Sequence, residues 1–192
     1  MSIGRTMEES LLKAMRSLET GVCHIYHKKF DDWTNDRLLE YIAEPTDDRL
    51  YAIAQLIRGG VDLVLIYNRT KIDMFFLEKF KNIVEFERVV EAAPMDIEVL
   101  REAKRMGFSD KFIGQLWGVS QHDMYLLREK NGIFPVYKMI DTCASEFSSY
   151  VPYFYSTYED ENESLVSDKE KIVVLGSGPI RIGQGVEFDY ST

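Results

Sequence analysis

Apolar residues recur at helical spacing in the first twenty residues of the chain. They lie three or four positions apart: Met7, Leu11, Ala14, Met15 and Leu18. Residues 6–9 have the Thr-x-x-Glu form of a capping box, in which two side chains satisfy free amides at a helix start. Gly21 follows and can end a helix. The pattern predicts one amphipathic helix.

Two short helices are predicted next. Asn35 can cap a helix that runs to Tyr41 and stops before Pro45. A second apolar series occupies residues 50–57 and ends at a pair of glycines, positions 59 and 60.

The segment over residues 61–67 is apolar enough for a strand, but it lies between two helical patterns. A short helix is favoured for that reason. Residues 70–73 form a variant capping box, and the longest helix is predicted from there up to Pro94. One face of that helix carries apolar residues at helical spacing: Phe76, Phe80, Ile83, Val84 and Val90.

Three further short helices are predicted between residues 94 and 132. The first two are closed by Gly107 and Gly118, and the third runs from Ser120 to Asn131-Gly132. These helices form a second cluster. The fold class is therefore mainly α, with two small helical subdomains at about residues 20–93 and 94–133.

The residue composition changes after residue 134. Residues 136–140 and 153–158 are rich in aromatic and β-branched side chains, which favours extended chain. Residues 159–170 are mainly polar and indicate a solvated linker. Residues 171–175 are continuously apolar after the first lysine, as in a buried strand of a parallel sheet, so a single α/β-type strand is expected there.

Composition and charge exclude several classes of function. The 192 residues carry 32 acidic and 23 basic side chains, a formal net charge of −9, which repels nucleic acids and anionic membranes. No segment approaches the roughly 20 apolar residues of a membrane helix, and no signal peptide begins the chain. Cys23 and Cys143 show no disulfide pattern. A cytoplasmic protein that binds neither nucleic acid nor membrane is expected.

A glycine-rich loop follows residue 175. It fits only two glycines of the dinucleotide-binding fingerprint, since Arg181 stands in place of the third glycine. It also lacks the lysine and hydroxyl of a phosphate-binding loop. A packing role, or the lining of a passage, is favoured over a nucleotide site. The residues of this candidate site are Gly176, Gly178, Arg181, Gly183 and Gly185.

Other chemistry is sparse. Cys23, His24 and His27 could share a face as metal ligands, but no second Cys/His pair has zinc-module spacing, so a solvated helix end is favoured and no metal is expected. Residues 109–132 have the outline of a helix-turn-helix, but acidic residues offset its cations, which favours a packing pair of helices. Pairs of carboxylates stand at helix starts, where capping explains them. No catalytic residue is assigned.

Four segments in order resemble one family. Residues 176–190 closely resemble the start of the second synthetase half of the carbamoyl phosphate synthetase large subunit. Residues 137–147, followed by residues 155–158, resemble the segment that precedes this half. Residues 70–77 and residues 3–11 are similar to two further stretches of the family.

The resemblance implies a division of the chain. Residues 1–19 would be the last helix of the first synthetase half, which contains an ATP-grasp domain. Residues 20–166 would be the helical oligomerisation domain, with an extended segment at 134–158. Residues 167–192 would be a linker with the first strand and glycine loop of the second half. Both ATP sites would then lie outside this chain.

The resemblance also implies a function for the parent enzyme. It would make carbamoyl phosphate from bicarbonate, glutamine-derived ammonia and two ATP, with magnesium or manganese at each ATP site and potassium assisting. The partners implied are other large subunits and the glutaminase small subunit. In this family the glycine turn helps to border a passage for carbamate, so Gly185 is expected to stay small for clearance.

Two classes of function are compared. The favoured one is an oligomerisation and linking segment of this ligase, which should self-associate and bind no ATP, through an exposed apolar stripe that the sequence does not locate. The alternative is an independent helical protein-binding module with a nucleotide-binding tail, which saturable ATP binding would reveal. A transcription factor using residues 109–132 is a weaker third reading, which salt-sensitive DNA binding would reveal.

Overall fold

The computed structural model describes residues 2–143, 146–147 and 153–174. Helices make up most of the described chain, as the sequence predicts. Their bounds are α1 Met7–Ser17, α2 Asn35–Tyr41, α3 Arg49–Arg58, α4 Leu63–Thr70, α5 Met74–Ala92, α6 Ile97–Arg105, α7 Asp110–Trp117 and α8 Gln121–Lys130, with a short 3-10 helix at Lys28–Phe30. The strands are β1 Val136–Met139 and β2 Phe154–Thr157.

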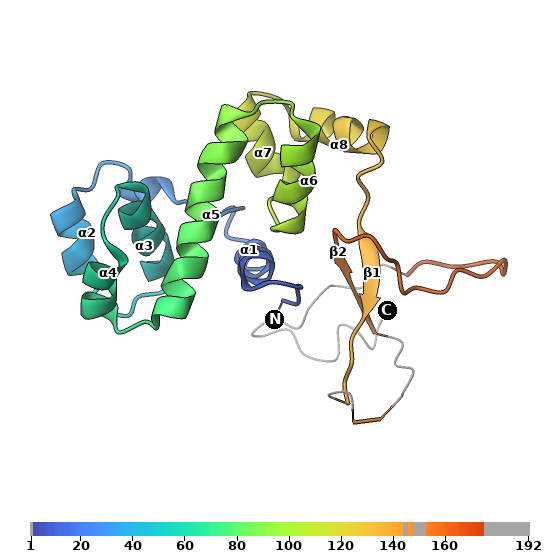
Figure 1. Cartoon of the computed structure of the whole chain (residues 1–192), viewed down its shortest axis with the longest axis horizontal. Coiled ribbons are helices and arrows are strands. Elements are labelled where there is room, and N and C mark those ends of the chain that lie inside the picture. The colour runs from blue at the N-terminus through green and yellow to red at the C-terminus, as the bar shows by residue number, and fades with distance from the viewer. Residues whose placement is uncertain (1, 144–145, 148–152, 175–192) are drawn as a thin grey trace.

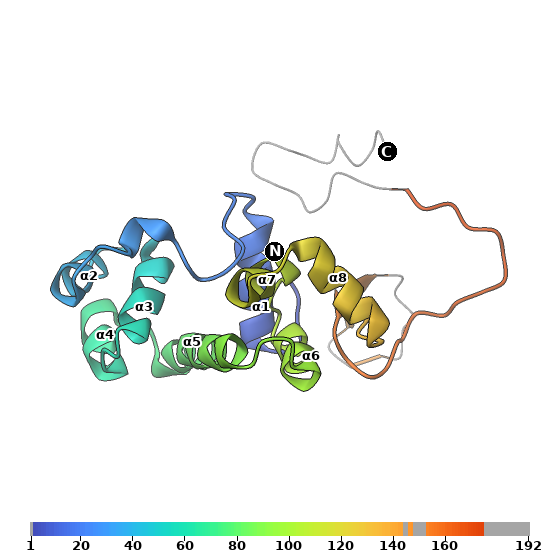
Figure 2. The same cartoon turned by 90° about the horizontal axis from the view of Figure 1, so that it is seen from above.

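Helix α5 is the axis of the molecule. The helices α2, α3 and α4 gather near its start, α6, α7 and α8 near its end, and α1 packs beside its middle (Figure 1). The view from above shows the same two groups on either side (Figure 2). The helices therefore form two groups, and the longest helix joins them.

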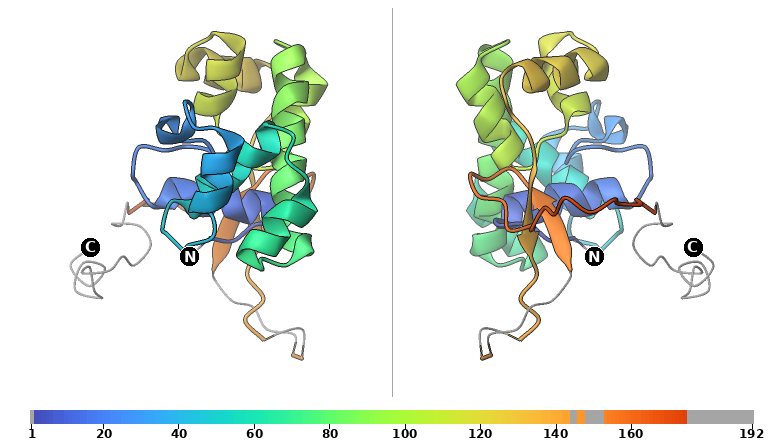
Figure 3. Two further views of the ribbon diagram at one scale, coloured as in Figure 1. Left: turned by 90° about the vertical axis from the view of Figure 1, so that its left-hand side faces the viewer. Right: turned by 90° about the vertical axis from the view of Figure 1, so that its right-hand side faces the viewer.

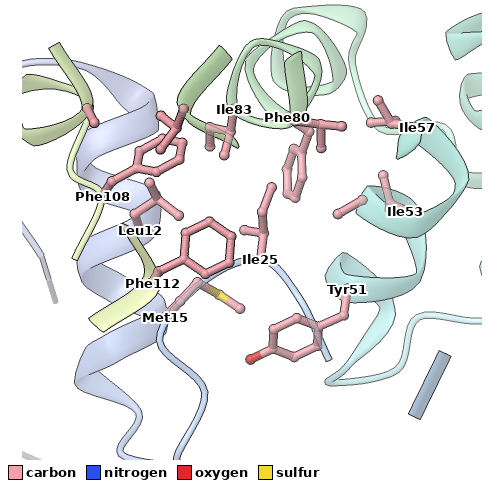
Figure 4. Close-up of a cluster of buried hydrophobic side chains, with 14 of the residues drawn as sticks. Leu12, Met15, Ile25, Tyr51, Ile53, Ile57, Phe80, Ile83, Phe108 and Phe112 are labelled. Carbon is pink, nitrogen blue, oxygen red and sulfur yellow. The ribbon is translucent and has the colours of Figure 1, made fainter. Parts of the chain in front are cut away.

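One buried core runs through both groups of helices. Leu12 of α1, Ile53 of α3, Phe80 of α5 and Phe108 of the turn before α7 all belong to a single cluster of buried side chains (Figure 4). The far end of α5 is also fixed by Trp117, whose indole N–H donates to the carbonyl oxygen of Val90 over 2.6 Å. Burial of such side chains is the main favourable contribution to folding.

The segment that could have been strand or helix is helical. Helix α4 begins after Asp62, whose carboxylate accepts from the amide of Val64 over 2.7 Å, and it buries Ile66. Its apolar run does not enter a sheet, because no strand lies beside it among the described residues.

Two predicted caps at helix starts need correction. Thr34 caps α2, since it has the extended conformation and its hydroxyl accepts a main-chain N–H, whereas Asn35 is already helical. At α1, Thr6 accepts from the amide of Glu9 as predicted, over 3.1 Å. The Glu9 carboxylate, however, accepts from the N–H of Arg5 instead of from Thr6, so only half of that capping box forms.

The start of α5 also differs from the prediction, whereas that of α8 agrees with it. Asp73 caps α5, and Thr70 belongs to the end of α4, where its hydroxyl donates to the carbonyl oxygen of Ile66 over 2.9 Å. A threonine that can bond back to its own helix is not available to begin the next one. At α8, Ser120 and Asp123 form a complete capping box.

The extended segments after residue 134 form a two-stranded antiparallel hairpin. Val136 lies opposite Thr157, and Met139 lies opposite Phe154. The hairpin lies beside α1 (Figure 3), where the Lys13 ammonium donates to the carbonyl oxygen of Ser156 over 2.6 Å. A two-stranded hairpin is marginal alone, so this contact with a helix contributes to holding it.

Part of the predicted linker, residues 162–163, forms hydrogen bonds with strand β1. The N–H of Tyr137 in β1 donates to the side-chain oxygen of Asn162 over 3.0 Å, and the N–H of Glu163 donates to the carbonyl oxygen of Tyr137 over 2.9 Å. Residues 162–163 therefore cover the outer edge of β1. Unpaired strand edges are otherwise templates for association with other chains.

The strand expected at residues 171–175 is not formed in its described part. Residues 171–174 have no strand geometry, and Ile172 is 93% exposed. A buried parallel strand needs neighbouring strands, and among the described residues β1 and β2 pair only with each other. The structure corrects the expectation for residues 171–174, and Leu175 lies outside the described residues.

Candidate functional site

The glycine-loop site predicted from the sequence lies outside the described residues. This applies to all five of its members: Gly176, Gly178, Arg181, Gly183 and Gly185. Their role in a passage stays a prediction.

The candidate metal ligands near residue 24 do not form a metal site. In the described part of the chain, no group of three His, Cys, Asp or Glu side chains could hold a metal ion. The alternative interpretation, a solvated helix end, is wrong for His24, which is only 1% exposed. Its ring stacks on Phe112 of α7, with ring centres 3.7 Å apart. His27 instead caps the 3-10 helix by accepting from the amide of Lys29.

His24 belongs to a buried network that joins three parts of the fold. Its Nε2 lies 2.9 Å from the carboxylate of Glu87 in α5, and that carboxylate also accepts two hydrogen bonds from Arg58 at the end of α3, over 2.7 and 2.8 Å. Arg58 donates in turn to the carbonyl oxygen of Ile25 over 3.0 Å. The loop after α1 is thereby attached to α3 and α5.

Burial and pairing shift the pKa values in this network. Burial lowers the pKa of His24 because it disfavours the charged ring, and this outweighs the hydrogen bond to Glu87. Burial opposes ionisation of Glu87 as well, but the hydrogen bonds from Arg58 and His24 outweigh it, so the pKa of Glu87 lies below its ordinary value. The network therefore consists of a carboxylate, a guanidinium and a neutral imidazole at neutral pH.

A second buried network lies within the α6–α8 group. Asp110, in the first turn of α7, accepts from the Lys104 ammonium over 2.9 Å and from two nitrogens of Arg128 over 2.8 to 3.0 Å. Burial lowers the pKa of Lys104 to about 8, against the opposing effect of Asp110. Tyr158, just beyond β2, lies against both cations, with its ring centre 4.9 Å from the Lys104 nitrogen. This packing joins the hairpin to the helices.

The second network also bears on the helix-turn-helix outline. Arg128 is one of the two cations of α8 that a DNA-reading helix would present, yet it is only 8% exposed and is bound to Asp110. The close approach of the two helices is supported by Gly114, since a Cβ there would lie 2.7 Å from the carbonyl oxygen of Val119. The arrangement supports a packing pair of helices.

One exposed apolar surface lies on α4 and the start of α5. Ile66 points into the core, while five large apolar side chains of α4 and the first turn of α5 are exposed. They are Val64, Leu65, Tyr67, Phe75 and Phe76, between 38% and 53% exposed. We call this set the α4–α5 apolar surface. Exposed apolar patches of this kind commonly mark interaction sites.

A hollow of about 940 Å³ adjoins this surface at Phe75 and extends between α1, α5 and α6. Its charged side chains are largely paired with one another. Lys79 pairs with Glu8 over 3.4 Å, and Arg5 pairs with Glu159 over 3.4 Å. Ion pairs at a protein surface typically contribute little to stability.

No helix in the described part of the chain combines the length and the apolar character that a membrane span requires.

Comparison with protein families gives two matches. A model described as the carbamoyl-phosphate synthetase large chain, oligomerisation domain, matches residues 1–132. A model described as the carbamoyl phosphate synthase preATP-grasp domain matches residues 168–192. The first match includes all the helices described above, α1 among them, and the second includes the glycine loop. The order of the two matches is the order that the sequence resemblance implies, and on this basis the chain belongs to the carbamoyl-phosphate synthetase large-chain family.

Proposed function

We propose that this chain is the oligomerisation and linking segment of the large subunit of a glutamine-dependent carbamoyl phosphate synthetase. One observation carries the proposal. The α4–α5 apolar surface lies within the region that the oligomerisation-domain model matches, residues 1–132. The parent enzyme would make carbamoyl phosphate from bicarbonate, glutamine-derived ammonia and two ATP. The glutaminase small subunit would be a further partner, and the cytoplasm would be its location.

The segment itself would carry no catalytic step. The buried groups with shifted pKa values, such as Glu87 and Asp110, are engaged in internal ion pairs and hydrogen bonds that join helices. The described residues contain no group of three or more His, Cys, Asp or Glu side chains that could hold a metal ion. The sequence resemblance implies that the ATP and metal sites lie in the flanking synthetase halves, which is consistent with a structural role for this segment.

Self-association would occur through the α4–α5 apolar surface. Helix α4 is apolar around most of its circumference, yet only Ile66 is fully buried within it. A helix with that pattern is stable when both sides are covered. A second copy of the same surface, related by a two-fold axis, would cover it symmetrically, which is the commonest arrangement in homo-oligomers.

The test is light scattering on the purified chain over a dilution series, with one variant on the surface and one matched control. Leu65→Glu places a charge in the α4–α5 apolar surface, where Leu65 is 52% exposed, and Leu126→Glu makes the same change on α8, where Leu126 is 45% exposed. The unmodified chain and Leu126→Glu should form a dimer or larger species that dissociates on dilution. Leu65→Glu should have the monomer mass throughout.

The opposite outcomes are informative. A strict monomer at every concentration would remove self-association from the proposal and leave only the linking role. Association of Leu65→Glu equal to that of Leu126→Glu would place the contact elsewhere on the chain. Saturable ATP binding by the chain would contradict the non-catalytic role and favour a nucleotide-binding module.

A further inference from the structure

A hollow of about 340 Å³ lies where the hairpin meets the helices. Its walls are the inner side of α1, the turn between α6 and α7, the start of α8 and the end of β2. The charged side chains that line it are Glu9, Lys13, Arg16, Lys104 and Asp110. A water takes up about 30 Å³ of liquid volume, so the space has room for a small ion with several waters.

Both carboxylates of the hollow are already bound by other groups. Glu9 accepts from the amide of Arg5 and pairs with the Lys13 ammonium, each over 2.7 Å. Asp110 is shared between Lys104 and Arg128, the latter through a bidentate contact. Neither carboxylate is within ion-pair distance of Arg16.

Arg16 is the cation without a counter-charge. It lies in the last turn of α1, and its Nη1 donates to the carbonyl oxygen of Gly107 over 2.7 Å. Among the described residues it forms no ion pair with any carboxylate. Burial lowers its pKa, against the weaker pull of distant groups such as Glu9 and Asp110. A guanidinium has five donors, and most of those on Arg16 have no protein acceptor here.

The balance of charge around the hollow is positive. Three cations, Lys13, Arg16 and Lys104, line the hollow with two carboxylates, which leaves an excess of one positive charge. Arg128 adds a further cation on the other side of Asp110. Tyr158 cannot supply the missing negative charge at neutral pH, because burial raises the pKa of its phenol further. Arg16 is only partly exposed, and a partly buried cation is stabilised when an opposite charge joins it.

We propose that this hollow binds one small oxyanion, either free phosphate or a carboxylate, against the guanidinium of Arg16. The planar fork of a guanidinium matches two oxygens of such a group. Ser109, Gln121 and Ser156 also line the hollow, and side chains of these types can donate to the remaining oxygens. The bound anion would join α1, the α6–α7 turn and β2, three elements that are distant in sequence.

The test is isothermal titration of inorganic phosphate into the purified 192-residue chain, with sodium chloride at matched ionic strength as the reference. The unmodified chain should show one saturable site. Arg16→Met should weaken binding at least tenfold. Arg105→Met is the matched control, because Arg105 lies outside the hollow and pairs with Asp160, and it should leave the affinity within twofold.

One further variant and one competing anion complete the test. Arg16→Lys retains the charge but loses the fork, so it should fold normally by circular dichroism and still bind several times more weakly. Sodium acetate distinguishes the sources: competition by acetate assigns the site to carboxylates as well, whereas phosphate binding unaffected by acetate assigns it to phosphate. Heat that vanishes at matched ionic strength, or equal affinity in Arg16→Met, would overturn the proposal.

Discussion

Asp110 is the carboxylate shared by two buried cations, Lys104 and Arg128, which otherwise donate only to main-chain carbonyl oxygens among the described residues. Removing its charge leaves both cations unpaired in a place from which water is largely excluded. We therefore expect Asp110→Asn to lower the free energy of unfolding by about 3 kcal/mol, the usual cost of breaking a buried ion pair from one side. Urea unfolding followed by circular dichroism at pH 7 measures this change.

Asp36→Asn is the matched control for that prediction. Asp36 also stands in the first turn of a helix, α2, but it is exposed. Its replacement should cost less than about 1 kcal/mol, the size of a favourable contact with a helix dipole. If the two variants lose similar stability, the Asp110 network contributes little beyond a helix-start effect.

Contacts between residues far apart in the chain could not be predicted from the sequence, whereas local caps could. The cap role of Ser120 depends on neighbours three positions away and is readable from a short motif. The partner of His24 is Glu87, 63 positions further along the chain, and nothing in the local sequence around either residue indicates the other. The local sequence therefore favours a solvated position for His24, which the structure does not bear out.

At the scale of elements, the His24–Glu87–Arg58 network makes the junction of the loop, α3 and α5 sensitive to acid. The pKa of His24 is lowered by burial from an ordinary value of 6.5. As the pH falls through that ordinary value, the unfolded chain takes up a proton that the folded chain excludes, so stability decreases. The pKa of Glu87 is also lowered, from an ordinary value of 4.5. Protonation of Glu87 therefore decreases the stability further only when the pH falls below that ordinary value.

The measurement is urea unfolding at several pH values between about 7.5 and 5.5, where carboxylates contribute little. The unmodified chain should lose stability towards the acid end, and His24→Gln should show a smaller slope whatever its absolute stability. His122→Gln, at an exposed histidine, should keep the original slope. Parallel slopes for the unmodified chain and His24→Gln would show that the buried ring does not control this response.

The order of elements was predictable because helices depend on a local period of apolar residues. All the helices of the described chain follow that period, including α4, where the neighbouring helices decided an ambiguous pattern. Helix starts were less predictable, since adjacent residues such as Thr34 and Asn35 are both good caps. The strand predicted at residues 171–175 is absent from its described part, because an apolar run forms a strand only beside a partner strand and the sequence pattern does not supply one.

At the scale of the whole molecule, the shared core predicts a single unfolding transition. The chain has two tryptophans, one in each group of helices. Trp33 packs edge-on against Phe30 and Tyr41, and Trp117 lies against the end of α5. If the groups unfold together, fluorescence from either tryptophan should give the same urea midpoint.

Trp33→Phe and Trp117→Phe each leave one reporter, and circular dichroism of each variant supplies its own reference midpoint. Agreement between fluorescence and dichroism within each variant is the expected result. A fluorescence midpoint that precedes the dichroism midpoint in only one variant would mean that the two groups of helices unfold separately.

Helix α5 has a mechanical consequence for any assembly. Its 19 residues form a rod about 28 Å long, with the α4–α5 apolar surface at one end and the Trp117 contact at the other. If such a helix tilts by about 10° about one end, its other end moves by about 5 Å over that length. A neighbouring molecule bound at the start of α5 could therefore displace the α6–α8 group at the other end of the helix.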